Sequence, residues 1–88
     1  MIKEITLDVS QLEPCEPLQR VLEALTQLSQ GEYLHVLHRM EPYPLYPILN
    51  QQGYAWQTQS GQQTPIEIFI WQAQDKETEQ VIKKVVSS

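Results

Sequence analysis

Apolar and polar residues alternate near the start of the chain. Ile5, Leu7 and Val9 are separated by Thr6 and Asp8. A period of two residues is typical of a β-strand that turns one face toward a core, because successive side chains of a strand point to opposite sides. The alternation therefore predicts the first strand of the fold.

A stripe of apolar residues at helical spacing follows this strand. It consists of Leu18, Val21, Leu22, Leu25 and Leu28. Pro17 suits the first helical position, since its missing N–H would have no partner there, and Gly31 suits the left-handed residue just past the end. The spacing predicts a helix over residues 17–29.

The segment from Tyr33 to His38 is apolar, short and directly behind the glycine stop, so we interpret it as a second strand. A strand, a crossover helix and a second strand joined by short links form a right-handed unit in which the two strands are parallel. The first two strands should therefore end at the same edge of the sheet.

Prolines open the second half of the chain. Pro42 and Pro44 stiffen a turn, and Pro47 has to lie in the first turn of a short helix, because deeper inside it would remove a hydrogen bond. The apolar side of that helix consists of Leu45, Ile48 and Leu49, and Gly53 ends it.

Two alternating segments predict an antiparallel hairpin near the end of the chain. The first contains Tyr54, Trp56 and Thr58, and the second contains Ile66, Ile68 and Ile70. Behind them, residues 75–88 place Val81, Ile82, Val85 and Val86 at helix-compatible spacing. This tail is either a helix or a frayed end.

The order β-α-β-α-β-β predicts an α/β (α+β) two-layer sandwich over residues 1–74, with a four-stranded mixed sheet and two helices on one face. The other face of the sheet should be polar, yet the second and fourth strands place Tyr33, Leu37, Phe69 and Trp71 on it. We therefore expect the tail helix or a second copy of the protein to cover that face.

The formal net charge is −5, and residues 1–73 carry all of the excess acid. In that segment eight acidic side chains stand against three basic ones, Lys3, Arg20 and Arg39. A protein that neutralises phosphates needs clustered Lys and Arg. The charge pattern therefore argues against nucleic acid and against an anionic membrane as partners.

The single cysteine cannot form an internal disulfide, and the first residues, Met1-Ile2-Lys3-Glu4, lack the basic start and apolar run of a secretion signal. No apolar stretch approaches the length of a membrane span. We therefore expect a cytoplasmic protein.

That cysteine, Cys15, directly precedes the predicted first helix. The positive end of a helix favours a thiolate and so favours a nucleophile, whereas the negative charges of Glu13 and Glu16 oppose one. Two interpretations are open. Cys15 is a reactive thiol, or it is a small half-buried residue that closes a turn braced by Pro14 and Pro17.

The loop after the second strand holds His38, Arg39, Glu41 and Tyr43. Because the first two strands are parallel, this loop and the Cys15 loop should share the carboxyl edge, where open α/β sheets bind ligands. A general base, a guanidinium for anions and a thiol would then meet. Alternatively, His38 only ends a strand, and the charged residues behind it are solvated turn residues.

A metal site is not expected, because His35 and His38 are three residues apart on a strand and point to opposite faces. The chain also has no glycine-rich phosphate loop and no nucleophilic serine in a recognisable setting. We therefore expect no bound metal and no cofactor.

Residues 7–9, the segment Leu-Glu-Pro-Cys-Glu-Pro-Leu over residues 12–18, and the stop Gly31-Glu32 are together similar to the start of the TusA/SirA-like proteins. These are small cytoplasmic sulfur carriers with the same β-α-β-α-β-β order. Residues 38–47 resemble an uncharacterised bacterial branch of that fold, some of whose members occur beside hemerythrin-like domains. The resemblance covers about residues 5–73 and leaves the tail outside.

The resemblance also implies a role for the cysteine. The carrier motif reads Cys-Pro-x-Pro, and its cysteine receives a persulfide sulfur from a desulfurase and passes it to an acceptor. This chain reads Pro14-Cys15-Glu16-Pro17, so Pro14 stands where the carrier has its cysteine. Pro17 matches the proline that starts the helix.

Two hypotheses follow. In the first, the protein is a small non-enzymatic binding or regulatory module. Its ligand-binding residues are His38, Arg39, Glu41 and Tyr43, and Pro44 and Pro47 form a rigid rim. Its partner is a hemerythrin-like protein, or a second copy bound through the open face of the sheet.

In the second hypothesis, the protein is a sulfur relay. Cys15 carries a persulfide, and Arg20 or the helix end stabilises the thiolate. The partners are then a desulfurase and a sulfur acceptor.

Overall fold

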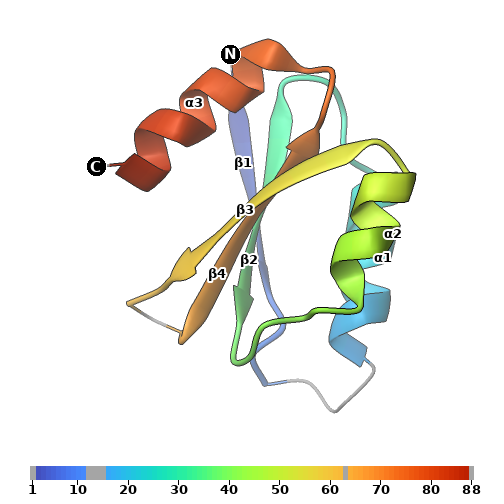
Figure 1. Cartoon of the computed structure of the whole chain (residues 1–88), viewed down its shortest axis with the longest axis vertical. Coiled ribbons are helices and arrows are strands. Elements are labelled where there is room, and N and C mark those ends of the chain that lie inside the picture. The colour runs from blue at the N-terminus through green and yellow to red at the C-terminus, as the bar shows by residue number, and fades with distance from the viewer. Residues whose placement is uncertain (1, 12–15, 63, 88) are drawn as a thin grey trace.

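The computed structural model describes residues 2–11, 16–62 and 64–87, and it contains a four-stranded sheet with helices on both faces (Figure 1). The elements in chain order are β1 (Lys3–Asp8), α1 (Glu16–Thr26), β2 (Glu32–His38), α2 (Leu45–Gln51), β3 (Tyr54–Ser60), β4 (Ile66–Gln72) and α3 (Lys76–Ser87). Across the sheet the strand order is β1-β2-β4-β3, with β1 parallel to β2 and β4 antiparallel to both neighbours. The predicted mixed sheet and the parallel first pair are confirmed.

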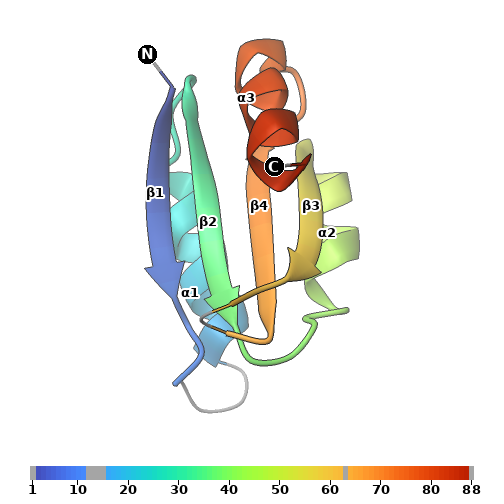
Figure 2. The ribbon, with the colours of Figure 1, turned by 90° about the vertical axis from the view of Figure 1, so that its left-hand side faces the viewer.

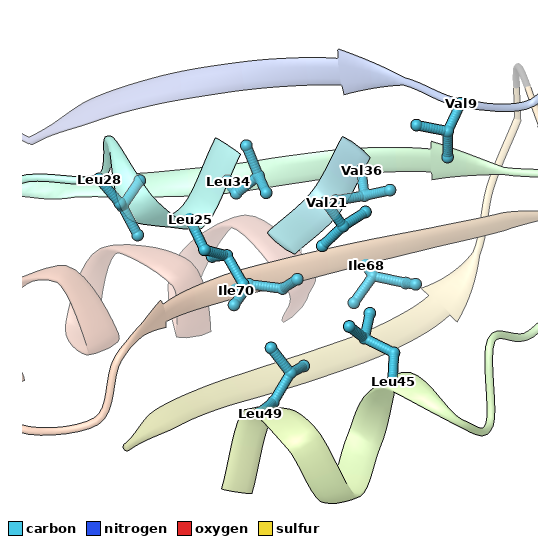
Figure 3. Close-up of a cluster of buried hydrophobic side chains, with 10 residues drawn as sticks. All are labelled: Val9, Val21, Leu25, Leu28, Leu34, Val36, Leu45, Leu49, Ile68 and Ile70. Atoms are coloured by element: carbon cyan, nitrogen blue, oxygen red, sulfur yellow. The ribbon is translucent and has the colours of Figure 1, made fainter. Parts of the chain in front are cut away.

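Helices α1 and α2 cover one face of the sheet (Figure 2). Their apolar sides and the strand residues that point toward them form the larger core cluster (Figure 3). This cluster consists of Val9, Val21, Leu25, Leu28, Leu34, Val36, Leu45, Leu49, Ile68 and Ile70. Burying one such side chain contributes roughly 1.5–3 kcal/mol relative to leaving it exposed, so this cluster supplies much of the driving force for folding.

Helix α1 ends at Thr26, earlier than the predicted end at residue 29. The backbone N–H groups of Gln27 and Leu28 bond to carbonyls three residues back, both at 3.1 Å, and such a tight last turn ends an α-helix. Leu28 is nevertheless buried in the core, as its spacing predicts. Gly31 adopts the expected left-handed conformation, with φ 85°.

Helix α3 lies on the opposite face of the sheet from α1 and α2 (Figure 2). The predicted order β-α-β-α-β-β and the two-layer description are wrong in omitting this third helix. The third helix forms because the second face of the sheet is also apolar. On that face Ile82 of α3 forms a buried cluster with Tyr33, Phe69 and Trp71. The expectation that the tail helix covers this face is confirmed for these aromatic residues, while pairing with a second copy stays a prediction.

Asp75 joins α3 to the rest of the domain. Its Oδ2 accepts hydrogen bonds from the Thr78 hydroxyl at 2.7 Å and from the backbone N–H of Gly31 at 2.8 Å. Its Oδ1 accepts from the backbone N–H of Thr78 at 3.3 Å. The bond from Gly31, followed by those from Thr78, lowers the pKa of Asp75. One carboxylate thus caps α3 and ties it to the connection between α1 and β2.

We predict that Asp75→Ala lowers the free energy of unfolding by about 1–3 kcal/mol in urea denaturation at pH 7, because a helix cap is lost and the Gly31 N–H loses its partner. Glu77→Ala, at an exposed position in the same turn, is the control and should change it by less than about 0.5 kcal/mol. Equal stability of wild type and Asp75→Ala would contradict the assignment of Asp75 as the cap of α3.

The contribution of Asp75 to the free energy of unfolding should depend on pH. Because the pKa of Asp75 is lowered in the folded state, its stabilisation is present above the ordinary aspartate value of about 3.9 and is lost as the pH falls through the lower folded value. The stability difference between wild type and Asp75→Asn should therefore narrow below about pH 4.

Candidate functional site

Strands β1 and β2 end side by side at the lower edge of the sheet in Figure 1. The backbone N–H of Val9 bonds to the Leu37 carbonyl at 2.9 Å, which continues the pairing past the end of β1. The N–H and hydroxyl of Ser10 both donate to Asp8 Oδ1, at 3.0 Å and 2.6 Å, and these bonds lower the pKa of Asp8. The end of β1 is thus a turn fixed by its own side chains.

His38 is the last residue of β2 and is 7% exposed. Its Nδ1 accepts a hydrogen bond from the backbone N–H of Met40 at 3.3 Å, which requires the tautomer with the proton on Nε2. Burial and, second, the positive charge of Arg39 lower the pKa of His38. The side chain is therefore a buried imidazole that favours its neutral form and shapes the turn.

Glu41 holds two tyrosines of the following segment. The hydroxyl of Tyr46, in α2, donates to Glu41 Oε1 at 3.0 Å. The Tyr46 hydroxyl also lies 2.9 Å from the hydroxyl of Thr58 in β3. Because the only hydroxyl proton of Tyr46 is donated to Glu41, Thr58 is the donor in the bond to Tyr46. A hydrogen bond to Glu41 raises the pKa of Tyr43. Burial first, and then Glu41, raise the pKa of Tyr46, although Thr58 opposes this rise.

The rings of these tyrosines pack against a tryptophan of β3. Tyr46 stacks on Trp56 with ring centroids 5.4 Å apart and planes 2° from parallel. Tyr43 meets Tyr46 at 6.2 Å and 88°. Stacked and edge-to-face pairs are the arrangements that aromatic rings prefer. We call Glu41, Tyr43, Tyr46 and Trp56 the aromatic corner.

The loop also exposes large apolar side chains. Met40 is 64% exposed and Tyr43 is 68% exposed, and among the described residues only Val85 joins them as an exposed large hydrophobic residue. Pro44 precedes α2 with φ −63°, and Pro47 lies in the first turn of α2, as predicted. The two apolar side chains therefore project from a backbone that prolines stiffen.

The structure separates the four predicted ligand-binding residues. Glu41 and Tyr43 belong to the aromatic corner. His38 is buried at the end of β2, and the positive charge of the exposed Arg39 contributes to lowering its pKa. Whether they bind a ligand stays a prediction.

The predicted residues of the first loop divide differently. Cys15 and Pro14 lie outside the described residues, and Pro17 lies in the first turn of α1.

Sequence reasoning missed two residues of this site, Trp56 and Thr58. The alternation in β3 places both on the sheet face that α2 covers, and α2 carries Tyr46. The alternation was visible in the sequence. The contact with a helix twelve residues earlier was not, since it depends on how α2 crosses the sheet.

A second polar cluster on the opposite face was also missed. His35 Nε2 lies 2.6 Å from Glu67 Oε1 in β4, and His35 Nδ1 lies 3.5 Å from Glu4 Oε2 in β1. The ring stacks on Phe69 at 4.5 Å. Tyr33 donates to Glu4 at 2.8 Å, and burial together with this bond raises its pKa to about 12. The cluster ties β1 and β4 to the central strand β2.

Among residues 2–11, 16–62 and 64–87, no group of three or more His, Cys, Asp or Glu side chains is arranged to hold a metal ion. In the same part of the chain, no helix has the length and apolar character needed to cross a membrane.

A family model described as an uncharacterized conserved protein (DUF2249) matches residues 6–72. The match includes the loop with the aromatic corner and stops at the end of β4, so α3 lies outside it. Neither a comparison with curated proteins nor one with solved structures found a match.

Proposed function

The chain belongs to this family of uncharacterised conserved proteins, and we propose that it is a small binding or regulatory module. Its partner is a protein, and the binding surface is the loop over residues 39–46. The observation that carries this proposal is the pair of exposed side chains, Met40 and Tyr43, on one proline-stiffened loop.

The composition of the loop fits a protein interface. Tyr, Met and Arg are enriched in the centres of interfaces, and the loop combines Arg39, Met40 and Tyr43. The Tyr43 ring packs edge-on against Tyr46, and Glu41 fixes Tyr46 through its hydroxyl before any partner arrives. Such preorganisation reduces the entropy that binding would otherwise cost.

We also infer that the family is a branch of the TusA/SirA-like fold. Within the matched residues 6–72 the elements follow the order β-α-β-α-β-β, and Pro17 lies in the first turn of α1 as the resemblance implies. In this view α3 is an addition to the shared fold. We propose a cytoplasmic location and, as the partner, a hemerythrin-like protein.

The start of α1 supports the sulfur relay as a second candidate function. Helix α1 begins at Glu16, so Cys15 is the residue directly before it in the sequence. The positive end of a helix favours a thiolate over a thiol. A relay would use this field to activate Cys15 for attack on the persulfide of a desulfurase.

The binding proposal predicts a cross-link to a protein partner from position 43. A photoreactive amino acid placed there in living cells should form an adduct, because the side chain is exposed. The same group at Gln52, an exposed residue just after α2, is the matched control and should not form that adduct.

With the purified partner identified in this way, Tyr43→Ala should weaken binding at least about tenfold, as expected for a hot-spot residue, and Gln52→Ala should not. An adduct of equal yield from both positions, or unchanged affinity of Tyr43→Ala, would contradict the proposal.

The relay hypothesis predicts that incubation with a cysteine desulfurase and cysteine adds one sulfur atom to the protein, and that Cys15→Ser abolishes the addition. Intact-protein mass spectrometry measures both. If wild type gains no sulfur while its thiol still reacts with a small alkylating reagent, the relay hypothesis fails.

A further inference from the structure

We propose that the aromatic corner recognises a cationic side chain, an arginine or a lysine, which the partner protein presents. The inference rests on the proposed function and names the chemistry of the partner at that site. It starts from the meeting of three aromatic rings with one carboxylate.

The rings provide the first part of the argument. A cation is attracted to the face of an aromatic ring, and an arginine also stacks on it. Tyr43 is 68% exposed and stands at 88° to Tyr46, so the two rings form a corner that opens toward solvent at Tyr43. Tyr46 and Trp56 are each only partly buried, and their stacking fixes the position of the Tyr46 ring in the corner.

Glu41 provides the second part. Its carboxylate accepts the Tyr46 hydroxyl at 3.0 Å, and the same carboxylate raises the pKa of Tyr43, so it lies close to both tyrosines of the corner. Phenol donors fix the position of a carboxylate without neutralising it, since they bring no positive charge. A full negative charge therefore lies beside the exposed ring.

The charge of the whole chain provides the third part. The chain carries −5 overall, and residues 1–73 hold eight acidic and three basic side chains. Such a protein attracts a basic partner from a distance and repels an acidic one. An anionic or purely apolar ligand would gain nothing from Glu41, whereas a cation would use the rings and the carboxylate together.

The experiment uses the full chain labelled with ¹⁵N and the probe N-acetyl-arginine N-methylamide, at constant ionic strength. The matched control probe is the citrulline analogue, which has a similar shape and no charge. The arginine probe should shift the backbone amides of Glu41, Tyr43, Leu45 and Tyr46 and the indole N–H of Trp56. The indole of Trp71, which is 5% exposed beneath α3, is an internal control and should not move.

Variants then assign the effect to the corner. Tyr43→Ala and Glu41→Gln should each weaken probe binding by about two- to fivefold, the range of one exposed cation–π contact or ion pair. Gln52→Ala, at the far end of α2, should leave probe binding unchanged.

Equal shifts with the citrulline probe, or unchanged binding in both corner variants, would overturn the inference. Its failure is distinguishable from that of the proposed function. If a partner cross-links from position 43 but the arginine probe does not bind, the binding module stands and the cation site is contradicted. If the arginine probe binds at the corner but no partner cross-links, the cation site stands and the binding module is contradicted.

Discussion

The need to bury both faces of the central strands β2 and β4 is the constraint on which the rest of the structure depends. On one face Leu34 and Ile68 pack under α1 and α2, and on the other Phe69 and Trp71 pack under α3. One layer of helices cannot cover both faces, so the second face needs a cover of its own, and α3 supplies it for Phe69 and Trp71. Much of both faces is consequently occupied, and binding residues have to come from edges and loops.

The loop over residues 39–46 fits this requirement because regular elements hold it. Thr58 and Trp56 of β3 contact Tyr46 of α2, and Tyr46 reaches back to Glu41. The exposed Tyr43 packs edge-on against Tyr46, and the same carboxylate raises its pKa. A strand, a helix and a loop therefore share one hydrogen-bonded unit, and side chains held in this way bind with less loss of entropy.

Local periodicity was enough to predict most elements, because helical and strand spacing depend on neighbours in the sequence. It placed α1 by its leucines and β3 by Tyr54 and Trp56. It could not decide whether residues 75–88 form a helix, since α3 is stabilised by Tyr33 and Trp71, which lie far away in the chain. The same limit applied to the candidate site. The prolines were enough to predict the loop, but the burial of His38 and the Tyr46–Thr58 contact depend on tertiary packing.

The central claim is that Glu41 holds this loop ready for a partner before binding. Backbone ¹⁵N relaxation of the free protein tests it most directly. We expect order parameters of about 0.85 for the amides of Met40, Glu41, Tyr43 and Tyr46, as in rigid backbone, and a clear fall at Tyr43 in Glu41→Ala. Order parameters below about 0.6 in the free wild-type loop, or no change in the variant, would contradict the claim.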